Sequence, residues 1–580
     1  MGLSLLQDRM RGIMIQLQTK FSRQVDEHNV LPEYPRPSLV RTSYLNGRWE
    51  CAFSKTPEIP LSFDLSILVP FSPECQLSGV SRQLKPGEYL WYRRTITLAK
   101  PQQDKRILLH FGAADQTAEV FVNRISAVRH CGGYLPFSAD ITDYLQEGDN
   151  ELIVRIQDES NTSWHARGKQ SLKPGGMFYT AQSGLWQTVW MEIVPVNYIE
   201  QIFYHIDYDQ GLVHLKVLTQ HSAPVECVIS GKDMEPVCIN GMTNSELIVS
   251  LPDFHPWTPE DPFLYLVSLK SGVDRVSSYF AMRKCDIQTA PDGTQRFFLN
   301  NKPYFQAGVL DQGYWPESLY TAPTDEALTA DISRMKKLGF NMLRKHAKIE
   351  PERFYYHCDQ LGMLVWQDMV NGGSPYKHWF VTYLATLMNW NHISFSDDEK
   401  HAGLLSRLDP EGKDEFRREI TETIAFLYNH PSIVVWVPFN EGWGQFDALA
   451  ACEQIRTLDS SRLVDHASGW FDQKGGDILS LHYYFLKLKF KPESKRAAAL
   501  TEFGGYSLSI PGHSCCKKVY GYKKFNSTGA LTYGYIDLIR QTILPAVKKG
   551  IGATVYTQLS DIEEETNGIY TYDREICKID

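Results

Sequence analysis

The spacing of hydrophobic residues divides the chain into three segments with different expected structures. In residues 1–196, short hydrophobic stretches such as 91–98, 117–123 and 150–156 are separated by Gly, Asn, Asp and Pro. Short strands with regular turn signals predict a two-sheet sandwich of the jelly-roll kind. Residues 197–285 continue this pattern over a shorter length, which predicts a second sandwich that is immunoglobulin-like.

The pattern changes near residue 286, where hydrophobic stretches of strand length begin to alternate with amphipathic helical stretches. Eight strands are expected, at residues 304–311, 341–346, 362–368, 432–441, 463–468, 477–484, 499–504 and 551–561. Helices are expected at residues 325–338, 351–361, 414–428, 446–457 and 535–549. Near-continuous hydrophobic strands that alternate with helices predict a (β/α)8 barrel over residues 286–580.

The connection after the third expected barrel strand, residues 371–410, is unusually long. It carries polar and aromatic residues that suit a binding site, namely Trp379, Trp390, Asn391, His392 and Asp397. A barrel connection of this length is typical of a functional lid.

Composition and charge exclude several classes of function. Of the 580 residues, 43% are hydrophobic and 22% are charged, which is ordinary for globular proteins. The net charge of -9 argues against nucleic acid or an anionic membrane as the main partner. No hydrophobic stretch approaches the ~18–20 residues of a membrane span. The first twenty residues lack the unbroken hydrophobic segment of a signal peptide.

The 11 cysteines are scattered and show no spacing typical of a metal site. Free thiols in a reducing compartment fit this usage best, so a cytoplasmic protein without a metal is expected. Association into a homo-oligomer is compatible with the sequence, which does not specify it.

Two glutamates stand at the ends of predicted barrel strands. Glu441 follows the fourth strand in the stretch WVPFNEGWGQFD, and Glu502 ends the seventh in LTEFG. The active site of such barrels lies at the carboxyl ends of the strands, so the two carboxylates can face each other. A retaining glycosidase needs this pair, ~5–5.5 Å apart, as proton donor and nucleophile. The alternative is that each is a solvated rim residue, which is less expected for two glutamates that both follow buried strands.

These motifs resemble glycoside hydrolase family 2, the family of β-galactosidases, β-mannosidases and β-glucuronidases. The resemblance rests on WVPFNEGWG, LTEFG, NMLRKH with CDQLGMLVWQD, SGLWQTVWMEI and HPWTPEDPFLYLV. It implies the family's order of domains: a jelly roll, an immunoglobulin-like sandwich and a catalytic barrel.

The resemblance also implies roles for individual residues. Glu441 is similar to the family's acid/base and Glu502 to its nucleophile. Asn440 matches the residue that reaches the sugar 2-hydroxyl. Tyr483 matches the sixth-strand tyrosine that hydrogen-bonds the nucleophile, and Arg344 the second-strand arginine beside it.

Other residues extend the expected sugar site or depart from the family's pattern. Trp443 and Trp470 suit a stacking platform for the sugar, or alternatively a closed barrel mouth. His346 stands one residue earlier than the family's histidine, and Tyr556 occupies the usual position of an eighth-strand tryptophan.

The region that holds the sugar carboxylate in β-glucuronidases also differs. Glu565 and Asn567 stand where those enzymes carry Asn and Lys, which favours an uncharged sugar. Lys345, Lys348 and Arg167 are the cations that could replace the missing charge.

The sequence therefore predicts a retaining exo-glycosidase for a terminal neutral sugar, most simply a β-D-galactoside, with no cofactor. A β-mannoside, β-glucoside, arabinoside or uronide stays open as substrate, as does a carbohydrate-binding protein without activity. The stretches 158–170 and 177–187 of the first sandwich hold Trp164, Arg167 and Gln182, which suit hydroxyl and ring contacts. At least one residue from 158–187 is expected to reach a bound sugar; the alternative is plain packing between domains.

Overall fold

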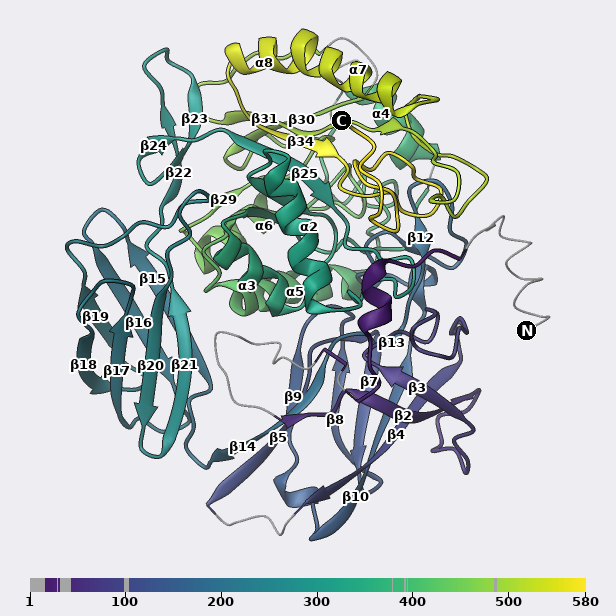
Figure 1. Cartoon of the computed structure of the whole chain (residues 1–580), viewed down its shortest axis with the longest axis vertical. Coiled ribbons are helices and arrows are strands. Elements are labelled where there is room, and N and C mark those ends of the chain that lie inside the picture. The colour runs from purple at the N-terminus through teal and green to yellow at the C-terminus, as the bar shows by residue number, and fades with distance from the viewer. Residues whose placement is uncertain are drawn as a thin grey trace.

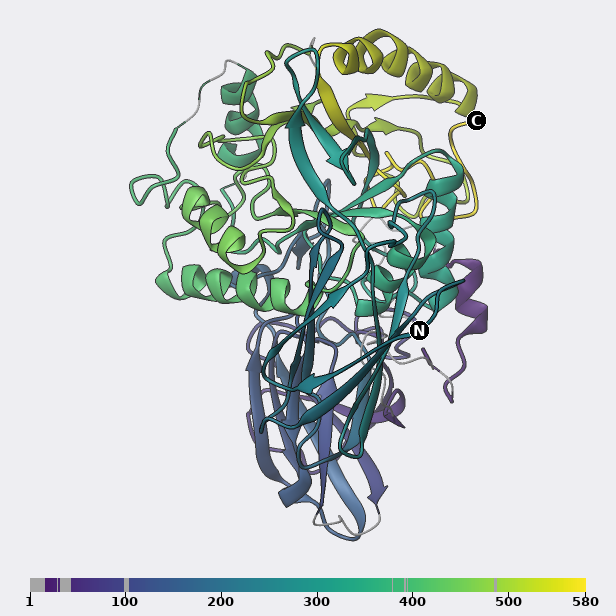
Figure 2. The ribbon, with the colours of Figure 1, turned by 90° about the vertical axis from the view of Figure 1, so that its left-hand side faces the viewer.

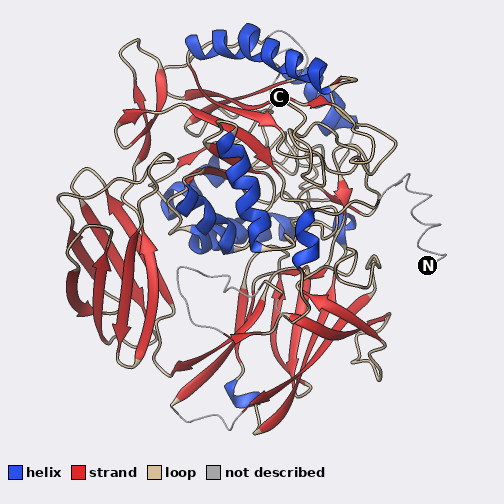
Figure 3. Ribbon diagram, in the orientation of Figure 1, coloured by secondary structure: helices blue, strands red, loops and turns tan. Residues whose placement is uncertain are grey.

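Two β-sandwiches and an α/β barrel make up the described part of the chain (Figure 1). The computed structural model describes residues 16–28, 30–31, 43–98, 104–377, 379–390, 393, 395–484 and 488–580. The predicted fold class is confirmed by this arrangement, while the boundaries after residues 196 and 285 stay predictions. Figure 3 shows that the helices gather around the barrel, whereas the sandwiches consist almost entirely of strands.

The first sandwich is built from two antiparallel sheets. The four-stranded sheet runs in the order β1 (Ser43–Tyr44), β14 (Val189–Pro195), β5 (Lys105–Phe111) and β9 (Phe137–Asp140). The six-stranded sheet runs β3 (Leu65–Val69), β2 (Gly47–Ser54), β4 (Tyr89–Leu98), β10 (Gly148–Gln157), β7 (Thr117–Val122) and β8 (Ile125–Cys131). Their inner faces bury large side chains such as Trp49, Tyr92 and Phe111, so the hydrophobic alternation forms one core.

Short elements surround these sheets. They are η1 (Lys20–Gln24), β6 (Ala114–Asp115), η2 (Thr142–Tyr144), η3 (Ser160–Thr162), β11 (Gln170–Ser171), β12 (Tyr179–Thr180) and β13 (Gly184–Leu185). The pair of β11 and β12 lies in the segment that runs toward the barrel mouth.

The second sandwich has sheets of three and four strands. The first contains β15 (Gln201–Asp207), β16 (Leu212–Leu218) and β19 (Glu246–Ser250). The second contains β18 (Val237–Met242), β17 (Pro224–Ser230), β20 (Tyr265–Ser271) and β21 (Asp274–Phe280). Alternate residues of β20 are buried, as expected for a strand with one face on the core. The second sandwich joins the barrel through Tyr279, whose hydroxyl donates to Asp359 at 2.8 Å.

A small sheet closes the amino-terminal end of the barrel. It consists of β22 (Cys285–Thr289), β23 (Gln295–Leu299) and β24 (Lys302–Pro303). Phe297 of β23 lies 5.9 Å from the ring of Trp366 in the barrel core. The opposite, carboxyl-terminal end is therefore the open one.

All eight expected barrel strands are present and form one parallel sheet. The order is β29 (Leu463–Val464), β28 (Ile433–Val437), β27 (Leu364–Asp368), β26 (Met342–Lys345), β25 (Gln306–Asp311), β34 (Ile551–Thr557), β31 (Ala497–Gly504) and β30 (Ile478–Tyr483). Several strands are buried along their whole length, which explains their unbroken hydrophobic sequences.

The barrel helices lie outside the strands (Figure 2). They are α2 (Asp325–Lys337), α3 (Glu352–Leu361), α5 (Pro410–Leu427), α6 (Ala448–Leu458), α7 (Thr528–Leu538), η5 (Ile539–Ile543) and α8 (Leu544–Lys548). Helix α2 begins where the Thr324 side chain accepts a hydrogen bond from the Ala327 N–H. Its acidic first turn and basic last turn both suit the helix dipole. None of the described helices is long and hydrophobic enough to cross a membrane.

Strands β29 and β30 do not pair with each other, so the ring of strands has one gap among its described residues. The connections on either side of β30 contain no helix in their described residues, which departs from the expected alternation. Polar side chains bridge the gap: the Ser480 hydroxyl donates to Asp465 at 3.0 Å and meets Thr501 at 2.6 Å. This polar seam lies directly beneath the end of the seventh strand.

Two short strands, β32 (Tyr506–Ser507) and β33 (Lys523–Lys524), follow the seventh barrel strand. The long connection after β27 contains η4 (Trp379–Leu384) and α4 (Ala385–Trp390). Both additions lie at the carboxyl end of the barrel.

Candidate active site

Glu441 is presented by a sharp turn just beyond strand β28. The strand is fully buried, and the chain then reaches Glu441, whose backbone φ is +50°. The Glu441 N–H donates to the Ser468 carbonyl at 2.9 Å, which fixes the turn. The side chain keeps 12% of its surface exposed. The buried strand therefore serves to hold a carboxylate at the open end of the barrel.

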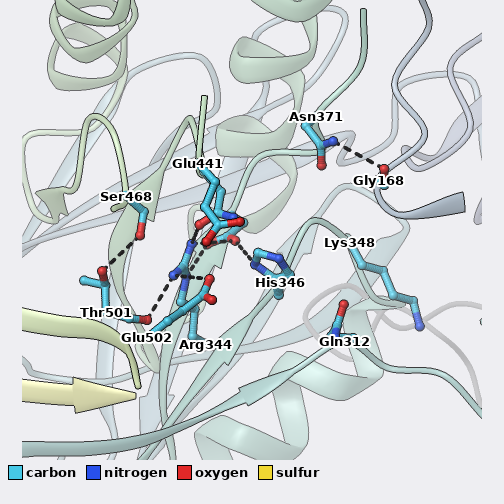
Figure 4. A network of polar contacts seen from close by, with 12 residues as sticks. Gly168, Gln312, Arg344, His346, Lys348, Asn371, Glu441, Ser468, Thr501 and Glu502 are labelled. Atoms are coloured by element: carbon cyan, nitrogen blue, oxygen red, sulfur yellow. Dashed lines mark hydrogen bonds and ion pairs between the residues drawn. The ribbon is translucent and has the colours of Figure 1, made fainter. Parts of the chain in front are cut away.

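Glu502 lies opposite Glu441, near the carboxyl end of strand β31. It is buried, and one of its oxygens lies within 4.8 Å of an oxygen of Glu441. Figure 4 shows the two carboxylates facing each other beside Arg344 and His346. This separation suits a retaining glycosidase, in which the carboxyl groups lie ~5–5.5 Å apart.

Arg344 connects the two strand ends. The Asp368 carboxylate holds the guanidinium through two bonds of 3.0 Å. The guanidinium then donates to Asn440 Oδ1 at 2.9 Å and to Glu502 Oε1 at 3.3 Å. A rigid planar fork of this kind sets the orientation of each partner. Arg344 thus lies where the sequence predicted it.

The charge on Glu502 is strongly favoured. Burial alone would raise the pKa of Glu502, but the positive charges of His482 and Arg344 outweigh it and lower the pKa to about 2. A carboxylate with this pKa is ionised throughout the neutral range. It is therefore ready to act as a nucleophile.

The tyrosine that contacts Glu502 is Tyr484, so the prediction of Tyr483 is wrong by one residue. The Tyr484 hydroxyl donates to Glu502 Oε2 and meets the Thr557 hydroxyl at 3.0 Å. Successive residues of a strand point to opposite faces, so Tyr483 points outward and packs against the hydrophobic core. The pairing of β30 with β31 shifts in register between Leu481 and His482, just before these residues.

His482 lies between the two carboxylates, and the sequence analysis missed it. Its Nδ1 lies 2.9 Å from Glu441 Oε1, and its Nε2 lies 3.7 Å from Glu502 Oε1 and 3.1 Å from the Ser468 hydroxyl. The signal that could have found it is the period of two in SLHYY, which puts His482 and Tyr484 on one face.

Three buried polar atoms at the site have no hydrogen-bond partner among the described residues. They are Asn440 Nδ2, Trp443 Nε1 and His346 Nε2. The other side of His346 is fixed, because its Nδ1 lies 2.7 Å from Asp368 Oδ2. Buried polar groups are normally satisfied, so these three are suited to the hydroxyl groups of a bound sugar.

The prediction of Tyr556 as a sugar contact is wrong. Tyr556 is buried and makes edge contacts with Phe503 and with Tyr535 of helix α7, so it faces the helices. The next residue, Thr557, faces inward and meets Tyr484. As on β30, the shift by one residue follows from the alternation along a strand.

Glu565 and Asn567 are bonded to protein groups and do not line the described cavity. The Tyr179 hydroxyl and the Asn567 amide donate to Glu565, the latter at 2.8 Å. Gln558 donates in turn to Asn567 Oδ1 at 2.9 Å. The predicted direct contact of these two residues with the sugar therefore has no support in the geometry.

The cations named as replacements for the missing charge are already paired. Lys345 Nζ contacts Asp311 and Glu350, and Lys348 Nζ contacts Glu350 and two backbone carbonyls. Arg167 donates to the carbonyls of residues 373 and 374.

The first sandwich reaches the barrel mouth from the expected stretches 158–170 and 177–187, but not through the three residues named there. Gln182 is buried against Ser72, and Trp164 packs against helix α5 at Gly412. Lys169 instead lies with its Nζ 5.4 Å from the ring centre of Trp443. Burial and the charge of Lys169 lower the pKa of His346, which indicates that this lysine faces the site.

Backbone contacts hold this segment in place. The N–H groups of Arg167 and Gly168 both donate to the Asn371 carbonyl at 3.0 Å. In return the Asn371 side-chain amide donates to the Gly168 carbonyl at 3.3 Å, the bond drawn in Figure 4. His165 forms an ion pair of 2.6 Å with Glu415 of helix α5. Two domains therefore build one site.

A cavity of about 330 Å³ opens beside Glu441. Its walls come from the first sandwich, the connection after β27 and the barrel. The lining residues are Met177, Val381, Tyr383, Thr386, Leu387, Glu441, Trp443, Trp470, His482, Tyr484, Tyr520 and Tyr522. Trp443 and Trp470 thus both lie at the cavity, where the sequence predicted a platform or a closed mouth.

The connection 371–410 forms one wall of this cavity through η4 and α4. Asp397 anchors the connection, because its carboxylate accepts from Gln445 Nε2 and from the Ala448 N–H, each at 3.0 Å. Asn391, His392 and the side chain of Trp390 lie outside the described residues.

Three clusters of described residues have donor atoms close enough to hold a metal ion. One is the trio of Glu441, His482 and Glu502. The other two lie elsewhere and contain Cys131, His165 and Glu415, and His513, Asp573 and Glu575. The direct contacts within the first trio already suit proton transfer without a metal.

Comparison with known proteins identifies the family. The sugar binding domain of glycosyl hydrolases family 2 matches residues 79–190, and the TIM barrel domain of the same family matches residues 293–542. Together the two models match more than half of the chain.

Curated relatives are similar at low identity. A β-galactosidase of Thermoanaerobacter pseudethanolicus is 25% identical over 441 residues, covering 72% of this chain and 54% of that protein. A β-glucuronidase of Chlorocebus aethiops is 23% identical over 450 residues, covering 68% and 63%. The chain thus spans between about half and two thirds of the length of these relatives.

Solved structures share the fold. A β-glucuronidase of Ruminococcus gnavus gives a TM-score of 0.73 at 18% identity, covering 92% of this chain and 95% of that one. A putative β-galactosidase from Bacteroides fragilis gives 0.67 at 17% identity, covering 93% and 84%. With two matching domain models and the shared architecture, the chain belongs to glycoside hydrolase family 2, a family of glycosidases.

Proposed function

We propose that the protein is a retaining exo-glycosidase that removes one terminal sugar by double displacement. The observation that carries this proposal is the close pairing of a buried, ionised Glu502 with a partly exposed Glu441. The pair has the spacing for direct attack without an intervening water molecule.

The steps follow from the positions of the two carboxylates. A Glu502 oxygen attacks the anomeric carbon while the glycosidic C–O bond breaks and Glu441 gives its proton to the departing oxygen. Water then attacks the glycosyl ester, Glu441 takes a proton from this water, and Glu502 is released. Arg344 and Tyr484 hold Glu502 in position through both steps.

A neutral sugar, most simply a β-D-galactoside, fits the charges around the site. Glu565 and Asn567 satisfy each other, and Lys345, Lys348 and Arg167 are paired. The similarity to a β-galactosidase supports this choice. The three unpartnered donors or acceptors suit sugar hydroxyls.

A uronide is the second candidate, and one observation favours it. Lys169 lies near Trp443 and has no hydrogen bond or ion pair through its Nζ among the described residues. The similarity to β-glucuronidases points in the same direction.

A reducing compartment is also proposed, because all 11 cysteines are free thiols.

The choice of sugar can be tested with nitrophenyl glycosides. We expect the best neutral glycoside, among β-galactoside, β-glucoside and β-mannoside, to exceed β-glucuronide and α-galacturonide by about a hundredfold in kcat/KM. The reason is that desolvating a sugar carboxylate beside two glutamates costs several kcal/mol, and ~1.4 kcal/mol is a tenfold change in rate constant.

Lys169→Met distinguishes the two candidates, with the exposed Lys173→Met of the same segment as control. If a uronide is the better substrate and Lys169→Met alone abolishes that preference, the neutral-sugar proposal is wrong.

A further inference from the structure

The cavity beside Glu441 extends outward from the space between the two carboxylates. His482 and Tyr484 line it and also contact Glu502, so its inner end belongs to the sugar site. In the proposed mechanism the acid protonates the departing oxygen, so the group attached to that oxygen lies next to Glu441. The outer part of the cavity is therefore the place where the aglycone binds.

The lining of this cavity is mostly hydrophobic and aromatic. Three aliphatic side chains contribute to it, those of Met177, Val381 and Leu387. Two tryptophans and four tyrosines supply ring faces: Trp443, Trp470, Tyr383, Tyr484, Tyr520 and Tyr522. The polar groups of the lining are the tyrosine hydroxyls, the indole N–H groups of Trp443 and Trp470, and the side chains of Glu441, His482 and Thr386. The wall formed by residues 381–387 offers only the hydroxyls of Tyr383 and Thr386.

The cavity continues onto an exposed hydrophobic surface. Tyr383 is 70% exposed and Leu387 is 50% exposed, although both line the cavity. Trp379 and Leu384 on the same helical stretch are also exposed. The opposite side of this stretch packs Phe380 and Val381 against Trp443, Trp470 and Phe471, which holds η4 and α4 in place. An exposed hydrophobic patch beside a pocket marks a binding surface.

We propose that the substrate is a glycoside of a hydrophobic, ring-containing alcohol or phenol rather than an oligosaccharide. This proposal rests on the proposed function and specifies its aglycone. One ring lies between the tryptophans and tyrosines of the cavity, and a larger aglycone extends along Tyr383 and Leu387. Aromatic side chains gain most from burying flat hydrophobic groups. A second sugar would bring several hydroxyl groups, and the wall of residues 381–387 offers only the hydroxyls of Tyr383 and Thr386 to replace the water they lose.

The test compares aglycones on whichever sugar the enzyme cleaves best. We expect kcat/KM for the 2-naphthyl glycoside to exceed that for the phenyl glycoside about tenfold, because the two phenols have similar acidity and differ mainly in hydrophobic area. We also expect kcat/KM for the benzyl glycoside to exceed kcat/KM for the disaccharide in which glucose is the leaving group. Glucose is the more acidic alcohol, so this preference would come from binding alone.

Two variants test whether the preference for a hydrophobic aglycone arises from the cavity. Leu387→Gln puts a polar group of similar size in the wall and should lower kcat/KM for the 2-naphthyl glycoside about fivefold to tenfold. The same change should leave the disaccharide unaffected. Leu449→Gln is the matched control, because Leu449 of helix α6 is 49% exposed, lies outside this hydrophobic patch and does not line the cavity. The rate of hydrolysis of the glycosyl-enzyme should not change, since the aglycone has left by then.

Failure of the inference and failure of the function give different results. A disaccharide that matches or exceeds the benzyl glycoside, with hydrolysis that still requires Glu502, would overturn the aglycone proposal alone. The same conclusion follows if Leu387→Gln lowers kcat/KM equally for the 2-naphthyl glycoside and the disaccharide. Absence of hydrolysis for every glycoside would overturn the proposed function itself.

Discussion

Replacing Glu502 with alanine is expected to lower kcat/KM by about 10⁴-fold or more, the scale on which enzymes with covalent intermediates lose activity without their nucleophile. Glu502 is the ionised carboxylate that Arg344 and Tyr484 hold in the site, so the alanine variant lacks the attacking oxygen. Sodium azide should restore activity, because a small anion fits the space left by the carboxylate. The product would be the glycosyl azide of inverted configuration.

Glu441→Ala is the companion variant, and its losses should depend on the leaving group. Glycosides of acidic phenols need little protonation and should be cleaved far better than alkyl glycosides. Steady-state rates on dinitrophenyl and alkyl glycosides measure this difference. Equal losses on both substrates for both variants would contradict the assigned roles.

Tyr484→Phe should lower kcat/KM by about a hundredfold, the typical effect of losing one donor to a charged group at an active site. The Tyr484 hydroxyl donates to Glu502, so its loss leaves that carboxylate less well held. Tyr483→Phe is the matched control and should have almost no effect, because Tyr483 faces the hydrophobic core.

The pH profile gives a second measure of Tyr484. Loss of a donor to the carboxylate raises the pKa of Glu502 from its low value of about 2. Protonated Glu502 is not a nucleophile, so kcat/KM falls as the pH drops through this pKa. The acidic limb of the profile should therefore move to higher pH in Tyr484→Phe. An unchanged limb, or equal effects from both tyrosine variants, would refute the assignment.

The barrel could be predicted because its strands are hydrophobic throughout and their ends carry the glutamates. Which side chains of a strand point into the site was harder to predict, because a shift of one residue selects the side chain on the opposite face. The family resemblance points to Tyr483 and Tyr556, whereas Tyr484 and Thr557 face inward. The alternation along a strand shows which residues share a face, but it does not show which of the two faces is turned toward the site.

For contacts between distant segments, the sequence indicates the stretch but not the side chain. Lys169 and Met177 lie in the stretches expected near the sugar, and they reach the barrel mouth although more than 250 residues separate each of them from Glu441. No periodicity or motif selects these two residues, because their contacts depend on how two folded domains pack. The same limit applies to Glu565, whose partner Tyr179 comes from the first sandwich.

Residues 165–168 join the first sandwich to the barrel mouth, so the barrel cannot be separated from this sandwich without changing the site. Arg167, Gly168 and His165 bind the connection after β27 and helix α5. A fragment starting at residue 286 would keep both carboxylates yet lose one wall of the aglycone cavity. The catalytic barrel is therefore not a transferable module. In a chimaera of two relatives, the first sandwich and the barrel would have to come from the same parent for that parent's substrate preference to be kept.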